Sequence, residues 1–149
     1  MSIKNKLLQH CKELIEARLK NAEDAMNRAQ ESANDNEKSS AGDKFETGRA
    51  MGHLEKEMFS RQYQESLLAL QKIQSIESKT GTQEIALGSL VEIDTKFYLI
   101  AIGLGKVNFE DREYYIVSEE SPIGQSIIGL RKNDTITINK VKMQIIDIQ

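Results

Sequence analysis

A stretch without proline or glycine, from Ile3 to about Ala33, is the feature that most constrains how this chain can fold. Apolar residues recur in it at intervals of three and four, at Leu8, Cys11, Ile15, Leu19, Ala22, Met26, Ala29 and Ala33. Such spacing places one apolar stripe along a single long helix. At ~1.5 Å per residue, about thirty residues predict a helix of about 45 to 50 Å.

A second stretch of similar character follows the polar segment Ser39–Met51. Its apolar stripe runs through Thr47, Met51, Leu54 and Met58, then shifts phase to Tyr63, Leu67, Leu70, Ile73 and Ile76. If the second stripe is paired with the first in reverse order, for example Ala29 with Met51 and Leu8 with Ile73, the two residue numbers of each pair have a nearly constant sum, as in an antiparallel pair of helices. We therefore predict an antiparallel coiled-coil hairpin over residues 1–79, with an acidic tip. Packing of the two helices into a larger bundle is the alternative.

The texture of the sequence changes after Ser78, where a short linker leads into apolar runs of strand character. About five strands are expected, with apolar runs at 87–93, 96–102, 113–118, 135–138 and 142–148. Turn signals separate them at Asp94-Thr95, Glu110-Asp111, Lys132-Asn133-Asp134 and Asn139-Lys140. One short helix is expected between Ser121, as N-cap, and Gly129, with Pro122 in its first turn. The fold class is thus α+β, with a small β-sheet domain over residues 80–149.

Charge and composition exclude several classes of protein. The net charge of −3 does not indicate a nucleic-acid-binding domain, and no run approaches the ~20 apolar residues of a membrane span. No apolar core of signal-peptide length begins the chain, so we expect a cytoplasmic protein. The single cysteine, Cys11, lies on the apolar stripe and is predicted to be a small buried hydrophobe. His10 and His53 are predicted to be surface residues of the helices, with metal ligation as the alternative.

Few residues of the sheet domain could carry out catalysis. It contains no His or Cys, and its Gly103-Leu104-Gly105-Lys106 segment lacks the following helix and Ser/Thr of a phosphate-binding loop. The tip offers more. Asp43 and Glu46, three residues apart at the beginning of a helix, fall on one face and present oxygen ligands suited to Mg²⁺. Two carboxylates alone bind Mg²⁺ weakly, so a partner would have to complete the site. The alternative is that both acids only stabilise the helix N-terminus through its dipole.

Two motifs resemble those of the GreA/GreB transcription elongation factors. That family has a hairpin tip of the pattern Gly-Asp-Leu-Ser-Glu-Asn, and Gly42-Asp43-Lys44-Phe45-Glu46-Thr47 keeps its Gly, Asp and Glu at the same spacing. The segment Ser121–Gly129, followed by Asn133–Ile136, resembles the helix-and-turn segment of the family's FKBP-like C-terminal domain. The resemblance covers essentially the whole chain.

The resemblance implies a transcription factor that binds bacterial RNA polymerase at its secondary channel. It implies that Ser121, Pro122, Ile123, Gly124 and Gln125 contact the polymerase. It also implies that Asp43 and Glu46 help to hold a Mg²⁺ shared with the polymerase, close to the RNA 3′ end, and so stimulate cleavage of backtracked RNA. The chain would then have no cofactor of its own and would not be an enzyme by itself. Because its apolar stripe would be satisfied within the hairpin, a monomer is expected.

Two other functions stay open. The residues after the acidic pair, Thr47-Gly48-Arg49-Ala50, differ from the family pattern, which suits a regulator that binds the same channel without stimulating cleavage. Arg49 itself could form a helix-surface salt bridge or contact RNA phosphate. The third function is a coiled-coil adaptor unrelated to transcription, in which the tip acids are only caps. Separately, the Ser121-Pro122 segment could be a helix cap that only orders the sheet domain, which is compatible with contact to the polymerase.

Overall fold

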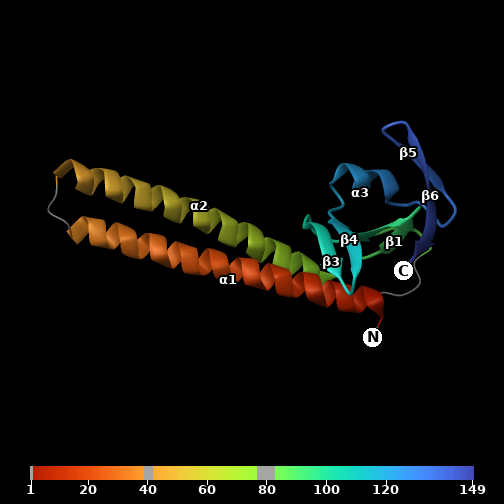
Figure 1. Cartoon of the computed structure of the whole chain (residues 1–149), viewed down its shortest axis with the longest axis horizontal. Coiled ribbons are helices and arrows are strands. Elements are labelled where there is room, and N and C mark those ends of the chain that lie inside the picture. The colour runs from red at the N-terminus through yellow and green to blue at the C-terminus, as the bar shows by residue number, and fades with distance from the viewer. Residues whose placement is uncertain (1, 39–41, 77–82) are drawn as a thin grey trace. The chain divides into compact units, whose positions relative to one another are not determined.

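Two long helices precede a six-stranded sheet in the computed structural model, which describes residues 2–38, 42–76 and 83–149 (Figure 1). The side chains of residue 33 and of residues 35–38 and 42–49 lie outside the described part. Helix α1 spans Ile3–Lys38 and α2 spans Gly42–Ser75. The remaining elements are β1 (Leu90–Ile93), β2 (Lys96–Ile100), β3 (Gly105–Phe109), β4 (Arg112–Val117), α3 (Pro122–Ile127), β5 (Thr135–Ile138) and β6 (Val141–Ile148). The α+β class is confirmed.

The strands form one sheet in the order β3-β4-β2-β1-β6-β5. Neighbouring strands are antiparallel except β2 and β4, which run parallel. The four predicted turns are confirmed, and each contains at least one non-glycine residue with positive φ: Asp94, Glu110, Asp111, Asn133, Asn139 and Lys140. Asn and Asp tolerate this conformation better than most residues, which is why the sequence marked these turns clearly.

About five strands were expected and the sheet has six, because Gly105–Phe109 forms an additional strand, β3, alongside β4. Only Val107 is buried in it, between Lys106 and Asn108, which are both exposed. A single buried residue gives too little alternation for a strand to be recognised from sequence. Gly105 begins the strand with φ of 77°, a conformation that glycine adopts without strain.

The sheet carries a hydrophobic core on the face that α3 covers. Seven buried side chains form it: Ile85, Val91, Ile93, Ile100, Ile127, Ile136 and Ile145. Alternate strand residues point to the opposite face, and these too are buried: Leu90, Leu99, Val107, Tyr114 and Ile116. The sheet is thus apolar on both faces and needs a cover on each.

The first turns of α1 supply the second cover. Residues Met1–Lys12 belong to one compact unit together with Lys72–Gln149. The ring of His10 stacks on that of Phe109 in β3, with centroids 4.9 Å apart, and Leu7 is fully buried. His10 is therefore half-buried against the sheet, which corrects the prediction of a surface residue. His53, by contrast, is exposed as predicted.

Cys11 is buried in the same unit, as predicted. Burial raises the pKa of its thiol to about 12, because the surroundings disfavour the charged thiolate. Since the thiolate is the reactive form, the thiol is inert in the folded protein.

The second compact unit, Glu13–Gln71, consists of the remaining parts of α1 and α2. Ser60 Oγ donates to Met26 Sδ at 3.0 Å, and four residues further along α1 the Gln30 side chain accepts from Lys56 Nζ. Moving four residues forward in α1, from Met26 to Gln30, thus corresponds to moving four residues back in α2, from Ser60 to Lys56. The two helices therefore run antiparallel within this unit.

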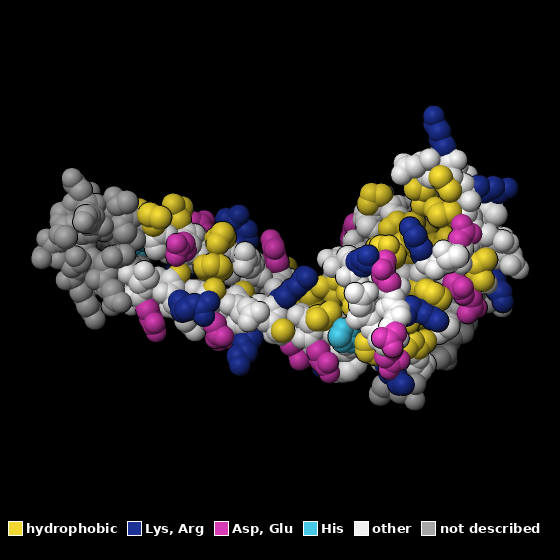
Figure 2. All heavy atoms as spheres, viewed as in Figure 1, with side chains coloured by type: hydrophobic (Ala, Val, Ile, Leu, Met, Phe, Trp, Pro, Cys, Tyr) yellow, Lys and Arg dark blue, Asp and Glu magenta, His cyan; other side chains and the backbone are white. Residues whose placement is uncertain are grey.

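The predicted face of α2 was wrong over part of its length. Met51, Leu54 and Met58 are exposed, whereas Gly52 is buried and Lys56 and Ser60 contact α1. Figure 2 shows apolar side chains exposed on the surface of the helices. The second part of the α2 stripe, from Tyr63 to Ile73, continues at helical spacing through Ser60, Lys56 and Gly52. The stripe of Met51, Leu54 and Met58 therefore faces away from α1. The expectation of a monomer rested on burial of the whole apolar stripe between the two helices. Because Met51, Leu54 and Met58 are exposed, that basis does not hold.

Substitution of Leu54 tests which face of α2 packs on α1. Leu54 is 66% exposed, so Leu54→Gln should change the free energy of unfolding by no more than about 0.5 kcal/mol. Ile15→Ala, at a position only 3% exposed, should lower it by about 2 to 5 kcal/mol. Urea unfolding followed by far-ultraviolet circular dichroism measures both. A loss for Leu54→Gln comparable to that for Ile15→Ala would contradict the observed face.

Reactivity of Cys11 tests the packing of α1 on the sheet. With the thiol buried and its pKa raised, a disulfide reagent at about pH 8 should modify the native protein only as fast as it opens. In urea the same thiol should react at the rate of an ordinary free cysteine. Rapid modification under native conditions would mean that the first turns of α1 do not cover it.

Candidate functional site

The two acids predicted to act at the tip lie at the beginning of α2. The helix starts at Gly42, so Asp43 and Glu46 fall in its first two turns, and their spacing of three places both on one face. Their side chains lie outside the described residues. The pair of oxygen ligands therefore stays a prediction. Carboxylates also suit the first turns of a helix electrostatically, whatever their further role.

The predicted cap of the short helix α3 is confirmed. Ser121 has extended backbone angles (φ −64°, ψ 154°), and its Oγ accepts from Gly124 N–H at 3.0 Å. The same hydroxyl donates to Ser118 C=O at 2.7 Å, and Pro122 follows in the first turn, where its lack of an N–H costs nothing. One side chain thus fixes both the end of the preceding loop and the start of α3.

Gly124 has a role that sequence reasoning missed. A Cβ at this position would lie 2.1 Å from Ser118 O and 2.9 Å from Ser121 Oγ, closer than atoms can approach. Only glycine lets the helix wind this tightly against the loop. A glycine in the first turn of a helix, where it weakens the helix, is the signal that could have revealed this.

The five residues predicted to contact a partner differ in exposure. Pro122 and Gln125 are exposed, whereas Gly124 is buried and Ile123 packs against the core of the sheet. Ser121 is half-buried and occupied by the cap. The surface of this segment is therefore formed by Pro122 and Gln125, while the other three residues hold its shape.

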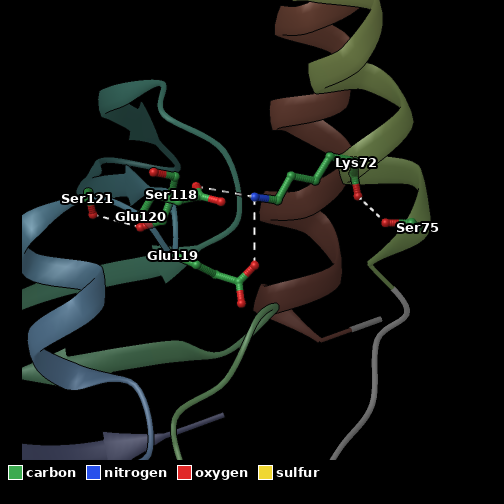
Figure 3. A network of polar contacts seen from close by, with 6 residues as sticks. All are labelled: Lys72, Ser75, Ser118, Glu119, Glu120 and Ser121. Carbon is green, nitrogen blue, oxygen red and sulfur yellow. Dashed lines mark hydrogen bonds and ion pairs between the residues drawn. The ribbon is translucent and has the colours of Figure 1, made fainter.

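A lysine and two glutamates adjoin the same segment (Figure 3). Lys72 Nζ lies 3.8 Å from a carboxylate oxygen of Glu119 and 3.8 Å from one of Glu120. Lys72 belongs to the last turn of α2, where a positive charge interacts favourably with the helix dipole. The sequence alone could not bring these groups together, because Lys72 is distant in the chain from both acids.

Tyrosines of β2 and β4 form a further cluster that the sequence did not predict. The rings of Tyr98 and Tyr115 stack with centroids 5.3 Å apart, because the parallel pairing of the two strands sets these residues side by side. Tyr115 donates its hydroxyl proton to Glu113, and Lys106 Nζ lies 3.0 Å from the same carboxylate. The hydrogen bond from Lys106 is the main cause that lowers the pKa of Glu113.

This arrangement is an exposed ion pair with its hydrogen bonds. The hydrogen bond to Glu113 also raises the pKa of Tyr115, whereas burial is the main cause that raises the pKa of Tyr98. All three shifts keep each group in its usual protonation state near neutral pH. The cluster therefore presents no acid or base prepared for proton transfer.

A groove of about 510 Å³ lies between α1 and α2 in the Glu13–Gln71 unit. Small side chains, Ala22 and Ala25, leave this space opposite Phe59, and Arg18 and Arg28 flank it. The groove is open to solvent. Over the described part of the chain, no three His, Cys, Asp or Glu side chains gather to hold a metal ion.

The chain matches no model of a known protein family, and no curated protein is significantly similar to it. None of the described helices is long and apolar enough to cross a membrane.

Substitution of Gly124 tests the close approach at the cap. Gly124→Ala should lower the free energy of unfolding of the sheet unit by about 1 to 3 kcal/mol, because the added methyl group overlaps Ser118 O. Gly103→Ala is the matched control, since nothing lies within 4 Å of the position that its methyl group would take, and it should be nearly neutral. Thermal or urea unfolding of the two variants measures the difference. Equal stability of both would mean that the loop and α3 are not in contact as described.

Proposed function

We propose that this protein is a Gre-like transcription elongation factor. In this proposal it binds bacterial RNA polymerase at the secondary channel and stimulates the polymerase's own cleavage of backtracked RNA. The observation that carries the proposal is the position of the Gly42-Asp43-Lys44-Phe45-Glu46 motif: it begins the second of two long antiparallel helices. In the family that it resembles, the corresponding motif stands at the tip of a hairpin.

The sheet unit gives a second line of support. Its Ser121–Pro122 motif is a genuine helix cap, and the helix it begins packs on a sheet that contains one parallel strand pair. An FKBP-like domain with a preformed docking segment is consistent with these features. Pro122 and Gln125 would supply the exposed contacts to the polymerase.

The chemistry assigned to the tip is that of shared metal ligands. A Mg²⁺ ion bound in the polymerase active site would supply the activation of water for phosphodiester hydrolysis. Asp43 and Glu46 would each offer a hard oxygen ligand, the donor type that Mg²⁺ prefers, and too few of them to bind the ion without the polymerase. The chain would thus have no resident cofactor and no activity alone.

Two alternatives each have an observation in their favour. The sequence Thr47-Gly48-Arg49-Ala50 departs from the family pattern, which favours a channel-binding regulator that does not stimulate cleavage. The exposed stripe of Met51, Leu54 and Met58 favours a helical adaptor that binds another protein through α2. In the adaptor, the tip acids would only stabilise the start of α2.

An RNA cleavage assay on stalled polymerase tests the proposal. Asp43→Asn combined with Glu46→Gln should lower stimulated cleavage by roughly tenfold or more, the scale of effect seen when groups that tune a metal site are removed. Binding to polymerase should be retained. The free energy of unfolding should fall by no more than about 2 kcal/mol, because each acid in the first turns of a helix contributes about 0.3 to 1 kcal/mol.

The matched control is Glu23→Gln combined with Asp24→Asn, which makes the same chemical change at two exposed positions of α1. It should leave cleavage unchanged. Binding without cleavage, even by the natural protein, would instead support the regulator. Failure of the natural protein to bind polymerase at all would overturn both transcription functions and leave the adaptor.

A further inference from the structure

The turn that precedes α3 contains two adjacent carboxylates, Glu119 and Glu120, which repel each other in the absence of a counter-charge. Lys72 supplies that charge, with Nζ 3.8 Å from an oxygen of each carboxylate (Figure 3). A single ammonium group thus bridges both acids. On the backbone side, Ser75 Oγ donates to Lys72 C=O at 2.6 Å, near the end of α2.

The bridged residues are directly connected to the cap of α3. Ser118 C=O, immediately before them, accepts from both the N–H and the hydroxyl of Ser121, immediately after them. The turn from Ser118 to Ser121 is therefore closed by two hydrogen bonds on one side and held to α2 by Lys72 on the other. Glu119 and Glu120 are the two central residues of this turn, and Ser121 Oγ in turn accepts from Gly124 N–H, so the backbone of the turn is continuous with the start of α3.

Lys72 contributes little to overall stability, because all three side chains are partly or largely exposed and the separations exceed hydrogen-bond length. We therefore expect Lys72 to affect the local order of the turn from Ser118 to Ser121 rather than the stability of the whole unit. A weak, bridging ion pair can bias a short segment between conformations without being required for the fold.

We propose that Lys72 is a positioning residue for the partner-binding segment Ser121–Gln125. It acts through Glu119 and Glu120, holding the turn so that Pro122 and Gln125 present one fixed surface. This inference rests on the proposed function, because the partner for that surface is RNA polymerase. It adds a residue outside the motif and assigns it an electrostatic role.

Amide hydrogen exchange and polymerase binding, measured on the full chain, test the inference together. Lys72→Gln should accelerate exchange of the Gly124 amide by roughly two- to fivefold and weaken polymerase binding by a similar factor, as expected for one exposed ion pair. Lys72→Arg, which keeps the charge, should behave as the natural protein. Lys142→Gln, which removes a lysine charge from an exposed position of β6, is the matched control and should change neither quantity.

Salt separates an electrostatic role from a merely structural one. At ~1 M salt the screening length falls to about 3 Å, so the natural protein should approach the exchange rate of Lys72→Gln, and that variant should respond little. Unchanged exchange of the Gly124 amide in Lys72→Gln would overturn the inference.

Faster exchange in Lys72→Gln with unchanged polymerase binding would overturn the docking role. If the natural protein does not bind polymerase, the proposed function and the docking role fail, while the exchange data still decide whether Lys72 orders the turn.

Discussion

Burial of the sheet on both faces is the constraint on which the rest of this structure depends. Apolar side chains of β1 and β2 point alternately to either side, with Val91 and Ile100 toward α3 and Leu90 and Leu99 away from it. With α3 as its only cover, the sheet would leave one apolar face exposed to solvent. The first turns of α1 cover that face, and for this reason Met1–Lys12 belongs to the same compact unit as the sheet. The two compact units divide within the helices: Lys12 and Glu13 of α1 belong to different units, as do Gln71 and Lys72 of α2.

Local signals in the sequence predicted what local physics decides. The four turns were found because Asn and Asp tolerate positive φ, and the α3 cap was found because Ser and Pro have distinct roles at a helix start. Features that depend on long-range packing were missed. β3 has one buried residue, and the orientation of α2 is set by which of two possible faces meets α1. The Tyr98–Tyr115 stack depends on a parallel pairing that no local pattern encodes.

The two parts of the candidate site differ in how far sequence and structure determine them. For Asp43 and Glu46, the predicted metal chemistry rests on the residue types alone, because two carboxylates at helical spacing are a candidate donor pair. For the segment Ser121–Gln125, the motif shows where the helix cap lies, and the packing shows which residues hold it. Gly124 and Ser121 are internal supports, and Lys72, from a distant part of the chain, contacts Glu119 and Glu120 just before the segment. A motif therefore identifies such a surface more readily than it identifies what keeps the surface in shape.

The strand order has a consequence for self-association. β3 and β5 are the end strands of the sheet, and each offers a row of backbone groups to which a strand from another chain could be added. Both are short, with five and four residues, and their outward side chains are polar: Lys106 and Asn108 in one, Thr135 and Thr137 in the other. Short polar margins of this kind are how natural β-proteins discourage edge-to-edge aggregation. The weak strand character that hid β3 from sequence reasoning is thus the same property that keeps this margin from recruiting neighbours.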